Sequence, residues 1–384
     1  MAKILHTADL HIRKHGDERW LALEELVRIG VQEEIDLLAV SGDLFDRDTD
    51  AEQLRDRIRE VFTGNGFKVA LLPGNHDNAS YQAGLYFGEE VIILGDPFSK
   101  IELSDAVVWG LPFEQLKETG VVRRLQELSN QINNSQELNN PQEQGKYSHK
   151  YHLLLYHGEL LDAFFSPQDL GHEEESGYMP AKLSYFEDTG LHHVLAGHFH
   201  TNFRVWNLPG GSSFIYPGSP VSITTREKGR RKANLLETGK PPQEISLDTF
   251  HYEEIVVELD PLEETDPLET IKSRLKQVHS ASYTFLRVTG YFNGETAGLT
   301  EQDLVKQIHR LISTKEVLPT SKGTLGQLEV PQVYLQAEFK DIRTILEDPL
   351  TQSFLEKLAQ RGESREEQKR IRDLTLQAIM EAKG

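Results

Sequence analysis

The sequence contains no cysteine among its 384 residues. This absence excludes disulfide bonds, metal sites built from thiolates, and catalysis by a cysteine nucleophile. A chain without disulfides fits a reducing compartment. We therefore expect the protein in the cytoplasm.

Long apolar segments are also missing. No hydrophobic run approaches the ~20 residues that a membrane-spanning helix needs, so no membrane association is expected. The opening residues, MAKILHTADLH, lack the apolar stretch of a secretory signal and read as a first β-strand. With 38% hydrophobic and 27% charged residues, the composition is typical of a folded protein, and the length predicts more than one domain.

Positive charge is scarce. The chain has 41 Lys and Arg against 61 Asp and Glu, a net charge of −20, so its long-range field repels phosphate. A nucleic-acid binder of this kind needs bound divalent metals, a basic loop or a basic partner. The densest basic segment supplies the candidate DNA-binding residues Arg226, Lys228, Arg230, Arg231 and Lys232. The same segment also reads as a solvated turn between two strands, and the sequence leaves both interpretations open.

Residues 1–235 alternate short aliphatic or β-branched runs with polar segments that contain glycine. Helical patterns lie between some of these runs; in Glu52–Phe62, apolar residues recur at the spacing of one helix face. Repeated strand, polar loop and helix predict an α/β domain with its functional site at the carboxyl ends of the strands.

Three further segments follow different patterns. Residues 117–148 include amide-rich stretches that are poor in apolar residues, so we expect an exposed, mobile insertion there. Residues 250–330 combine strand and amphipathic helix patterns, which predicts a small α+β capping domain. Residues 332–384 read as helical, and Ser364 with Glu367 forms a capping box at the start of the last helix.

Polar clusters follow five of the predicted strands. They are Asp9 with His11, Asp43, Asn75 with His76, His157, and His198 with His200. Two divalent ions need one carboxylate to bridge them, together with nitrogens and amide oxygens to complete their coordination. A bridging water of lowered pKa would then supply hydroxide at neutral pH, and a remaining histidine would protonate the leaving oxygen. The mixture of nitrogen and oxygen donors suits manganese, iron or zinc better than magnesium or calcium.

Each cluster also has a simpler structural interpretation when it is taken alone. Gly42-Asp43 is typical of a turn, and His157 reads as a buried core histidine. His198 and His200 read as residues on the solvent-facing side of an extended segment. The five clusters together, each at the end of a strand, favour the metal site.

The same series of motifs resembles the calcineurin-like metallophosphoesterase superfamily. Its members share Asp-x-His, Gly-Asp-x-x-Asp, Gly-Asn-His-Asp, His-Gly and Gly-His-x-His, which stand here at 9–11, 42–46, 74–77, 157–158 and 197–200. The segments LHTADLH at 5–11, GDLFD at 42–46 and YPGSP at 216–220 are similar to the SbcD branch of DNA repair nucleases.

The resemblance implies a fold, a set of ligands and partners. The implied fold is a two-sheet α/β sandwich with a small capping domain and C-terminal helices. Asp9, His11 and His200 would hold one metal, Asn75, His157 and His198 the other, and Asp43 would bridge them; the metal is usually manganese. His76 would be the catalytic histidine, with Asp77 orienting it. The implied partners are DNA, a second copy in a homodimer, and an SbcC-like ATPase of the SMC family bound through the C-terminal helices.

Two other functions compete with a DNA nuclease. The first is a phosphatase or small-substrate phosphodiesterase on the same metal core. Protein phosphatases, however, have glycine where Asp48 stands and glutamate where Asp77 stands. The second is a scaffold that mainly carries an ATPase partner. The complete ligand set favours catalysis over a scaffold.

Overall fold

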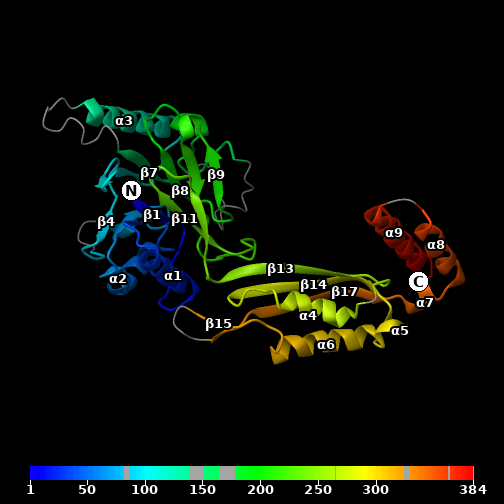
Figure 1. Ribbon diagram of the computed structural model, residues 1–384. Helices are drawn as coiled ribbons and strands as arrows, with labels where there is room; N and C mark the ends of the chain where they lie inside the picture. Colours follow the sequence, from blue (N-terminus) through cyan, green and yellow to red (C-terminus); the bar gives the residue numbers. More distant parts are fainter. Residues whose placement is uncertain are drawn as a thin grey trace. The chain divides into compact units, whose positions relative to one another are not determined.

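The computed structural model describes residues 1–81, 86–137, 150–163, 178–263, 265–323, 328–361 and 364–383 (Figure 1). The chain divides into two compact units. The first comprises Met1–Tyr252 with Lys322–Leu328, and the second comprises Glu253–Ser321 with Glu329–Gly384. The division into domains 1–235, 250–330 and 332–384 stays a prediction.

The first unit contains two six-stranded sheets. The strand order of the first sheet is β12 (Gln243–Ser246), β11 (Lys232–Glu237), β1 (Lys3–Thr7), β2 (Leu37–Ser41), β3 (Lys68–Leu72) and β4 (Val91–Ile93). The order of the second sheet is β5 (Lys100–Glu102), β6 (Ala106–Leu111), β7 (Tyr151–His157), β8 (His193–Gly197), β10 (Ser213–Tyr216) and β9 (Arg204–Asn207). Strands β1 to β4 are parallel to one another, and so are β6, β7, β8 and β10.

The two sheets pack face to face because alternate residues of a strand point to opposite faces. In β1, Ile4 packs in the core between the sheets, and Leu5 packs in the core on the outer face. In β7, Leu153 packs in the core between the sheets, and Leu154 packs in the core on the outer face of the second sheet. Helices α1 (Glu18–Gln32) and α2 (Asp48–Phe62) contribute to the outer core of the first sheet (Figure 1). The predicted two-sheet α/β sandwich is therefore confirmed.

Helix α3 (Glu118–Glu137) occupies much of the segment that we expected to be an exposed insertion. That expectation is wrong for these residues. Val121, Leu125, Leu128 and Ile132 recur at helical spacing and are buried in the outer core of the second sheet. Four apolar residues on one face are enough to hold a helix whose remaining faces are rich in amides. Residues 138–149 of the expected insertion lie outside the described residues.

Smaller elements complete the first unit. Short 3-10 helices cover Asn78–Tyr81, Leu183–Phe186 and Pro209–Gly211. Two short strands, β15 (Ser321–Lys322) and β16 (Leu328–Glu329), form a separate two-stranded sheet.

The second unit is built on a three-stranded sheet in the order β13 (His251–Leu259), β14 (Ser282–Phe292) and β17 (Gln332–Asp341). Helices α4 (Pro267–Leu275) and α6 (Glu301–Thr314) share one core with this sheet. Ile271 and Ile308 from the two helices are buried in it. The short helix α5 (Gly294–Ala297) follows β14. These elements match the strand and helix patterns that the sequence shows between residues 255 and 312.

Strand β17 replaces the helix that we expected from Gln332 onward. Val333, Leu335 and Phe339 lie in the core of the second unit. They are two and four residues apart, so in a strand all three side chains point to the same face. The whole strand pairs in parallel with β14, from Gln332 beside Tyr283 to Asp341 beside Phe292. Pairing with a strand some 50 residues earlier is not visible in local periodicity.

Three helices follow β17: α7 (Arg343–Leu346), α8 (Pro349–Ala359) and α9 (Arg365–Lys383). Ile342, Ile345 and Leu376 form a small core against Tyr291 of β14. The ion pair between Arg372 and Asp260, at 2.7 Å, also holds α9 within the second unit. Among the described residues, no helix combines the length and the apolar character that a membrane span requires.

Candidate functional site

The five predicted clusters meet in space because of the sheet topology. Asp9 and His11 follow β1, Asp43 follows β2, and Asn75 and His76 follow β3, so they leave the first sheet at the carboxyl ends of neighbouring parallel strands. The other cluster residues come from the second sheet. His157 is the last residue of β7, and His198 and His200 follow β8. Two sheets thus direct their carboxyl ends at one site.

Four of these residues have an unusual backbone. Asp9, His11, Asp43 and His198 have φ values of 57°, 48°, 52° and 95°, in the left-handed region that non-glycine residues rarely occupy. Such conformations cost on the order of 1–3 kcal/mol each and persist where the surrounding structure enforces them. The folded chain therefore fixes the directions of these side chains.

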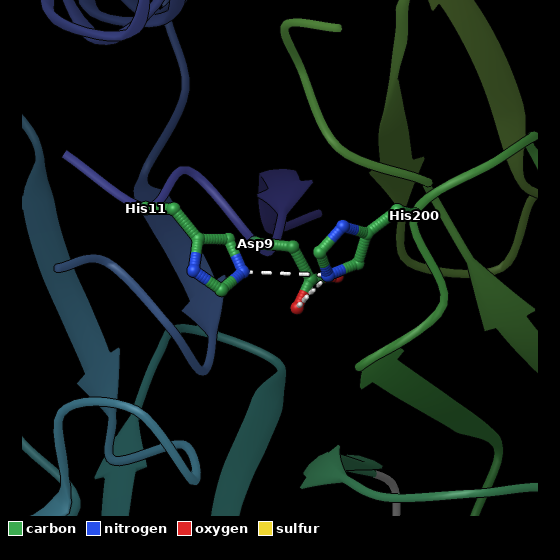
Figure 2. Close-up of side chains that lie close together, drawn as sticks. All are labelled: Asp9, His11 and His200. Atoms are coloured by element: carbon green, nitrogen blue, oxygen red, sulfur yellow. Dashed lines mark hydrogen bonds and ion pairs between the residues drawn. The ribbon is translucent and has the colours of Figure 1, made fainter. Parts of the chain in front are cut away.

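Asp9, His11 and His200 form the first group of converging donors (Figure 2). The Nε2 atoms of His11 and His200 are 3.3 Å apart, and His200 Nε2 is 3.9 Å from Asp9 Oδ1. The backbone N–H of His198 donates to both carboxylate oxygens of Asp9 at 3.0 Å and so orients the carboxylate.

Asp43 joins this group to a second one. Its Oδ2 atom is 3.2 Å from His157 Nε2 and 3.7 Å from His11 Nε2, while Oδ1 accepts a hydrogen bond from the backbone of His76 at 2.9 Å. Within the part of the chain that the structure describes, Oδ2 makes no hydrogen bond although it is fully buried. This carboxylate therefore lies in the position that a bridging ligand requires.

His157 and Asn75 complete the second group. His157 Nδ1 lies 2.8 Å from the carbonyl oxygen of Ser41, so Nδ1 carries the proton and Nε2 faces inward. Nε2 then faces Asp43 Oδ2 and also Asn75 Oδ1, which is 2.8 Å away. Three electron-rich atoms face one another, and such a group is stable only with a second proton on the ring or with a cation among them. The donor set therefore fits a divalent metal.

The remaining histidine of the predicted set, His198, packs beside this group. Its ring meets the His157 ring edge to face, with centroids 5.3 Å apart. It belongs to none of the three groups of converging metal-type ligands among the described residues, which are Asp9/His11/His200, His11/Asp43/His76 and Asp9/Asp43/His157.

Burial and charge set the pKa values in this site. Burial raises the pKa of the Asp9 carboxyl to about 6, although the charges of His200 and His157 oppose it. Burial also disfavours ionisation of Asp43, but the charge of His157 outweighs it and holds the Asp43 pKa below its usual value. Burial lowers and the Asp43 charge raises the pKa of His157, which reaches about 10. The negative charge of Asp43 thus stabilises positive charge beside it, on the His157 ring or on a cation.

His76 stands at the mouth of the site. It is half-buried and lines a cavity of about 630 Å³ together with His11, Asn75 and His200. Its Nδ1 atom is 3.2 Å from the backbone oxygen of Asp46.

Asp77, the residue that the resemblance implies as orienting His76, contacts neighbouring loops of the site, and its orienting role stays a prediction. Its buried carboxylate accepts hydrogen bonds from the backbone of Gly74 and Phe45 and from the Tyr81 hydroxyl. Burial, reinforced by the charge of Asp43, raises the Asp77 pKa to about 7. Asp77 therefore holds two loops of the site together.

Two carboxylates that we did not predict as site residues lie behind the histidines. Asp46 Oδ1 is 3.7 Å from His11 Nδ1, and Glu227 Oε1 is 3.7 Å from His200 Nδ1. Carboxylates in this position orient metal-binding imidazoles. Asp46 belongs to the Gly-Asp-x-x-Asp motif, so a sequence signal existed for it. Glu227 is the single acidic residue of the basic segment, and no sequence pattern distinguishes it.

The candidate DNA-binding residues do not form one exposed patch. Arg226 and Lys228 are exposed, Arg230 pairs with Asp248, and Lys232 Nζ pairs with Glu244 at 2.8 Å. Arg231 is buried, and its guanidinium donates to the backbone oxygens of His200, Thr201 and Ser219. Arg231 is therefore not an exposed member of the basic segment, because its guanidinium binds three backbone oxygens, and its role in DNA binding stays a prediction.

Close packing at the site predicts the effect of Gly42→Ala. A Cβ at Gly42 would lie 2.0 Å from His157 Nδ1, and the φ of +95° is itself unfavourable for alanine. We expect the metal-free protein to lose at least about 3 kcal/mol of unfolding free energy, from overpacking and backbone strain combined. Urea denaturation measures the loss. Gly16→Ala is the matched control, because Gly16 has a φ of +80° and no atom within 4 Å of its Cβ position. Equal losses in the two variants would show that crowding against His157 is not the cause.

Comparison with a known family supports the interpretation of the site. Residues 2–202 match the profile of the calcineurin-like phosphoesterase family. A search of curated proteins finds no significant match.

The sequence is 14% identical to a Thermus thermophilus protein of known structure, covering 64% of this chain and 98% of that one with a TM-score of 0.40. It is 11% identical to a dimetal phosphatase from Danio rerio (64% and 96% covered, TM-score 0.43). It is 17% identical to the phosphopantetheinyl hydrolase of Mycobacterium tuberculosis (57% and 90% covered, TM-score 0.32).

The family match covers more than half of the chain and includes every strand end that carries a predicted metal ligand. The chain belongs to the calcineurin-like phosphoesterase family.

Proposed function

We propose that this phosphoesterase is a DNA nuclease of SbcD type, which hydrolyses phosphodiester bonds as an exonuclease and endonuclease in the repair of double-strand breaks. The observation that supports phosphodiester hydrolysis most directly is Asp43, whose buried Oδ2 atom faces imidazoles of both donor groups. DNA as the substrate is supported by the segments at 5–11 and 42–46, which resemble the SbcD branch.

The residues of the site divide into two ligand sets. Asp9, His11 and His200 would hold one ion, Asn75, His157 and His198 would hold the other, and Asp43 would contact both. We propose manganese because the set mixes imidazole nitrogens with carboxylate and amide oxygens. When bound, the two ions supply a water of lowered pKa and neutralise the phosphate oxygens.

His76 would act on the leaving group. It lines the cavity beside the ligands, and the contact of Nδ1 with the Asp46 carbonyl fixes the ring. An imidazole in this place can give a proton to the oxygen that leaves the phosphate. Phe113 and Tyr178, whose rings are 5.9 Å apart, form an aromatic wall of the same cavity.

The test of the proposed function compares two substrates under manganese. The purified chain should degrade end-labelled linear double-stranded DNA and also hydrolyse bis(p-nitrophenyl) phosphate, and EDTA should stop both reactions. If the small ester is hydrolysed and DNA stays intact even after the SMC-type ATPase partner is added, the DNA assignment is wrong. A small phosphodiester or a phosphomonoester would then be the substrate of the same metal site.

The proposed partner is an SbcC-like ATPase of the SMC family, bound by the C-terminal helices of a homodimeric nuclease. Leu350 of α8 and Leu374 of α9 are 81% and 60% exposed, and apolar side chains of this size on neighbouring helices favour a protein interface.

We expect the double substitution Leu350→Glu and Leu374→Glu to reduce co-purification with the co-expressed ATPase at least about tenfold, because each introduces a charge into an apolar contact. Glu356→Lys on α8 is a control for a change of surface charge. Unchanged co-purification of the double variant would exclude these leucines as the docking surface.

A further inference from the structure

A second cavity of the first unit, of about 320 Å³, is lined by four cationic side chains: Arg204, Arg230, Arg231 and Lys232. The other described residues that line it are uncharged. Such a concentration of positive charge stands out in a chain with a net charge of −20. The cavity lies beside the loop that follows His200, since Thr201 and Asn202 form part of its wall.

Arg231 is the buried part of this cavity. Only 3% of the residue is exposed, and all of its guanidinium nitrogens donate to backbone oxygens, those of His200, Thr201 and Ser219. Burial lowers the pKa of Arg231 to about 10, although the charge of Glu227 opposes it, so the group remains charged at neutral pH. Its guanidinium donates to no carboxylate within the described part of the chain. A buried charge without a directly bonded counter-ion is costly, and an anion in the cavity would offset that cost.

The three other cations lie nearer to solvent. The side chain of Arg204 is exposed and makes no ion pair with any residue that the structure describes. Arg230 and Lys232 pair with Asp248 and Glu244, whose side chains are 62% and 52% exposed. Exposed ion pairs are weak, so both cations remain available to a ligand that brings a higher charge density. Arg204 and Arg231 alone give the cavity two positive charges that no ion pair neutralises.

We propose that this cavity binds a phosphate group. The exposed guanidinium of Arg204 can donate to two phosphate oxygens at once, and the buried Arg231 adds its positive charge from the wall of the cavity. The inference rests on the proposed function for the origin of the ligand: the phosphate belongs to the polynucleotide strand, at a distance from the bond that is cleaved. Because Arg231 also binds the backbone oxygen of His200, the cavity is joined directly to a loop of the metal site. A strand held here would be held in register with the ligands of that site.

The experiment measures binding of a fluorescent single-stranded oligonucleotide to the full chain in EDTA, which removes the contribution of divalent metals. We expect Arg204→Gln to weaken binding on the order of fivefold at low salt. The slope of log affinity against log salt should also fall by about 0.7, the contribution of one phosphate on a single strand. A merely structural role for Arg204 would not change the slope. Arg57→Gln on α2 removes one positive charge from an exposed helix and serves as the matched control.

A second probe, inorganic pyrophosphate, separates this proposal from the proposed function. The protein should unfold at a higher temperature with pyrophosphate in EDTA, and Arg204→Gln should lose most of that shift. If pyrophosphate stabilises the protein through Arg204 but no oligonucleotide binds, the cavity takes a free phosphate compound and not a strand, and the cleavage assay under manganese decides the DNA assignment separately. If the oligonucleotide binds with equal affinity and salt slope to the wild type and to Arg204→Gln, the phosphate cavity is excluded while the nuclease proposal stands.

Discussion

Asp43→Ala is expected to abolish binding of both metals and to reduce phosphodiester hydrolysis by at least about a thousandfold. The reason is the position of Oδ2, which lies 3.7 Å from His11 Nε2 of one donor group and 3.2 Å from His157 Nε2 of the other. Asp9 also shares a group with each of these imidazoles, but its Oδ1 atom is 4.0 Å from His157 and approaches Nδ1, the nitrogen that contacts the Ser41 carbonyl. Metal content after dialysis, measured by mass spectrometry, and hydrolysis of bis(p-nitrophenyl) phosphate under manganese test the expectation.

Two further variants make this experiment specific. Asp43→Asn keeps an oxygen that can accept the hydrogen bond from the His76 backbone, so it separates loss of the charge from loss of the loop contact. Asp56→Ala removes an exposed aspartate of α2 and should keep both metals and full activity. Two tightly bound metals per chain in Asp43→Ala would contradict the bridging assignment.

His76→Ala should have the second-largest effect on hydrolysis. Unlike Asp43→Ala, it should leave metal binding intact. We expect both metals to remain bound, because Asp9, Asp43 and His157 are unchanged, while hydrolysis of DNA falls by a factor on the order of 10² to 10⁴. The ring lines the cavity, and its Nδ1 atom contacts the Asp46 carbonyl oxygen. Metal analysis and single-turnover cleavage of end-labelled DNA measure the two effects.

The choice of leaving group tests the role of His76 as an acid. A general acid contributes least when the leaving oxygen is already a weak base, as in p-nitrophenyl esters. The loss in His76→Ala should therefore be much larger for DNA than for bis(p-nitrophenyl) phosphate. A loss of equal size for both substrates would show that His76 binds or positions the phosphate and does not protonate the leaving group. His309→Ala, at an exposed position of α6, is the control for removal of an imidazole.

The convergence of the candidate ligands could be predicted from sequence because the ends of strands are recognisable from the local sequence. Lys3–Thr7 and Lys68–Leu72 are strands rich in apolar residues, and the polar residues Asp9 and Asn75 follow them within three positions. Parallel strands place their carboxyl ends at one edge, so finding the ligands did not require the contact between Asp9 and His200.

Features that depend on distant contacts could not be predicted. Strand β17 was missed because its partner β14 is remote in sequence, and Glu227 was missed because its proximity to His200 depends on the path of a loop. The burial of Arg231 also depends on contacts that are distant in sequence. A run of positive charges contains no signal that one of its members is buried beneath the loop after His200. Helix α3 was missed because its amide-rich surface conceals four buried apolar residues.

The pairing of β1 with β11 has a consequence for synthesis of the chain. Lys3 of the first strand pairs with Glu237, and Asp9 is held by the backbone of His198. One edge of β1 therefore stays unpaired until the ribosome has passed residue 237, which takes about 10 to 50 seconds at ordinary translation rates. Because the backbone of His198 orients Asp9, we expect metal binding to be a late step in the synthesis of the chain. Until then the exposed edge is a site for chaperones and for aggregation.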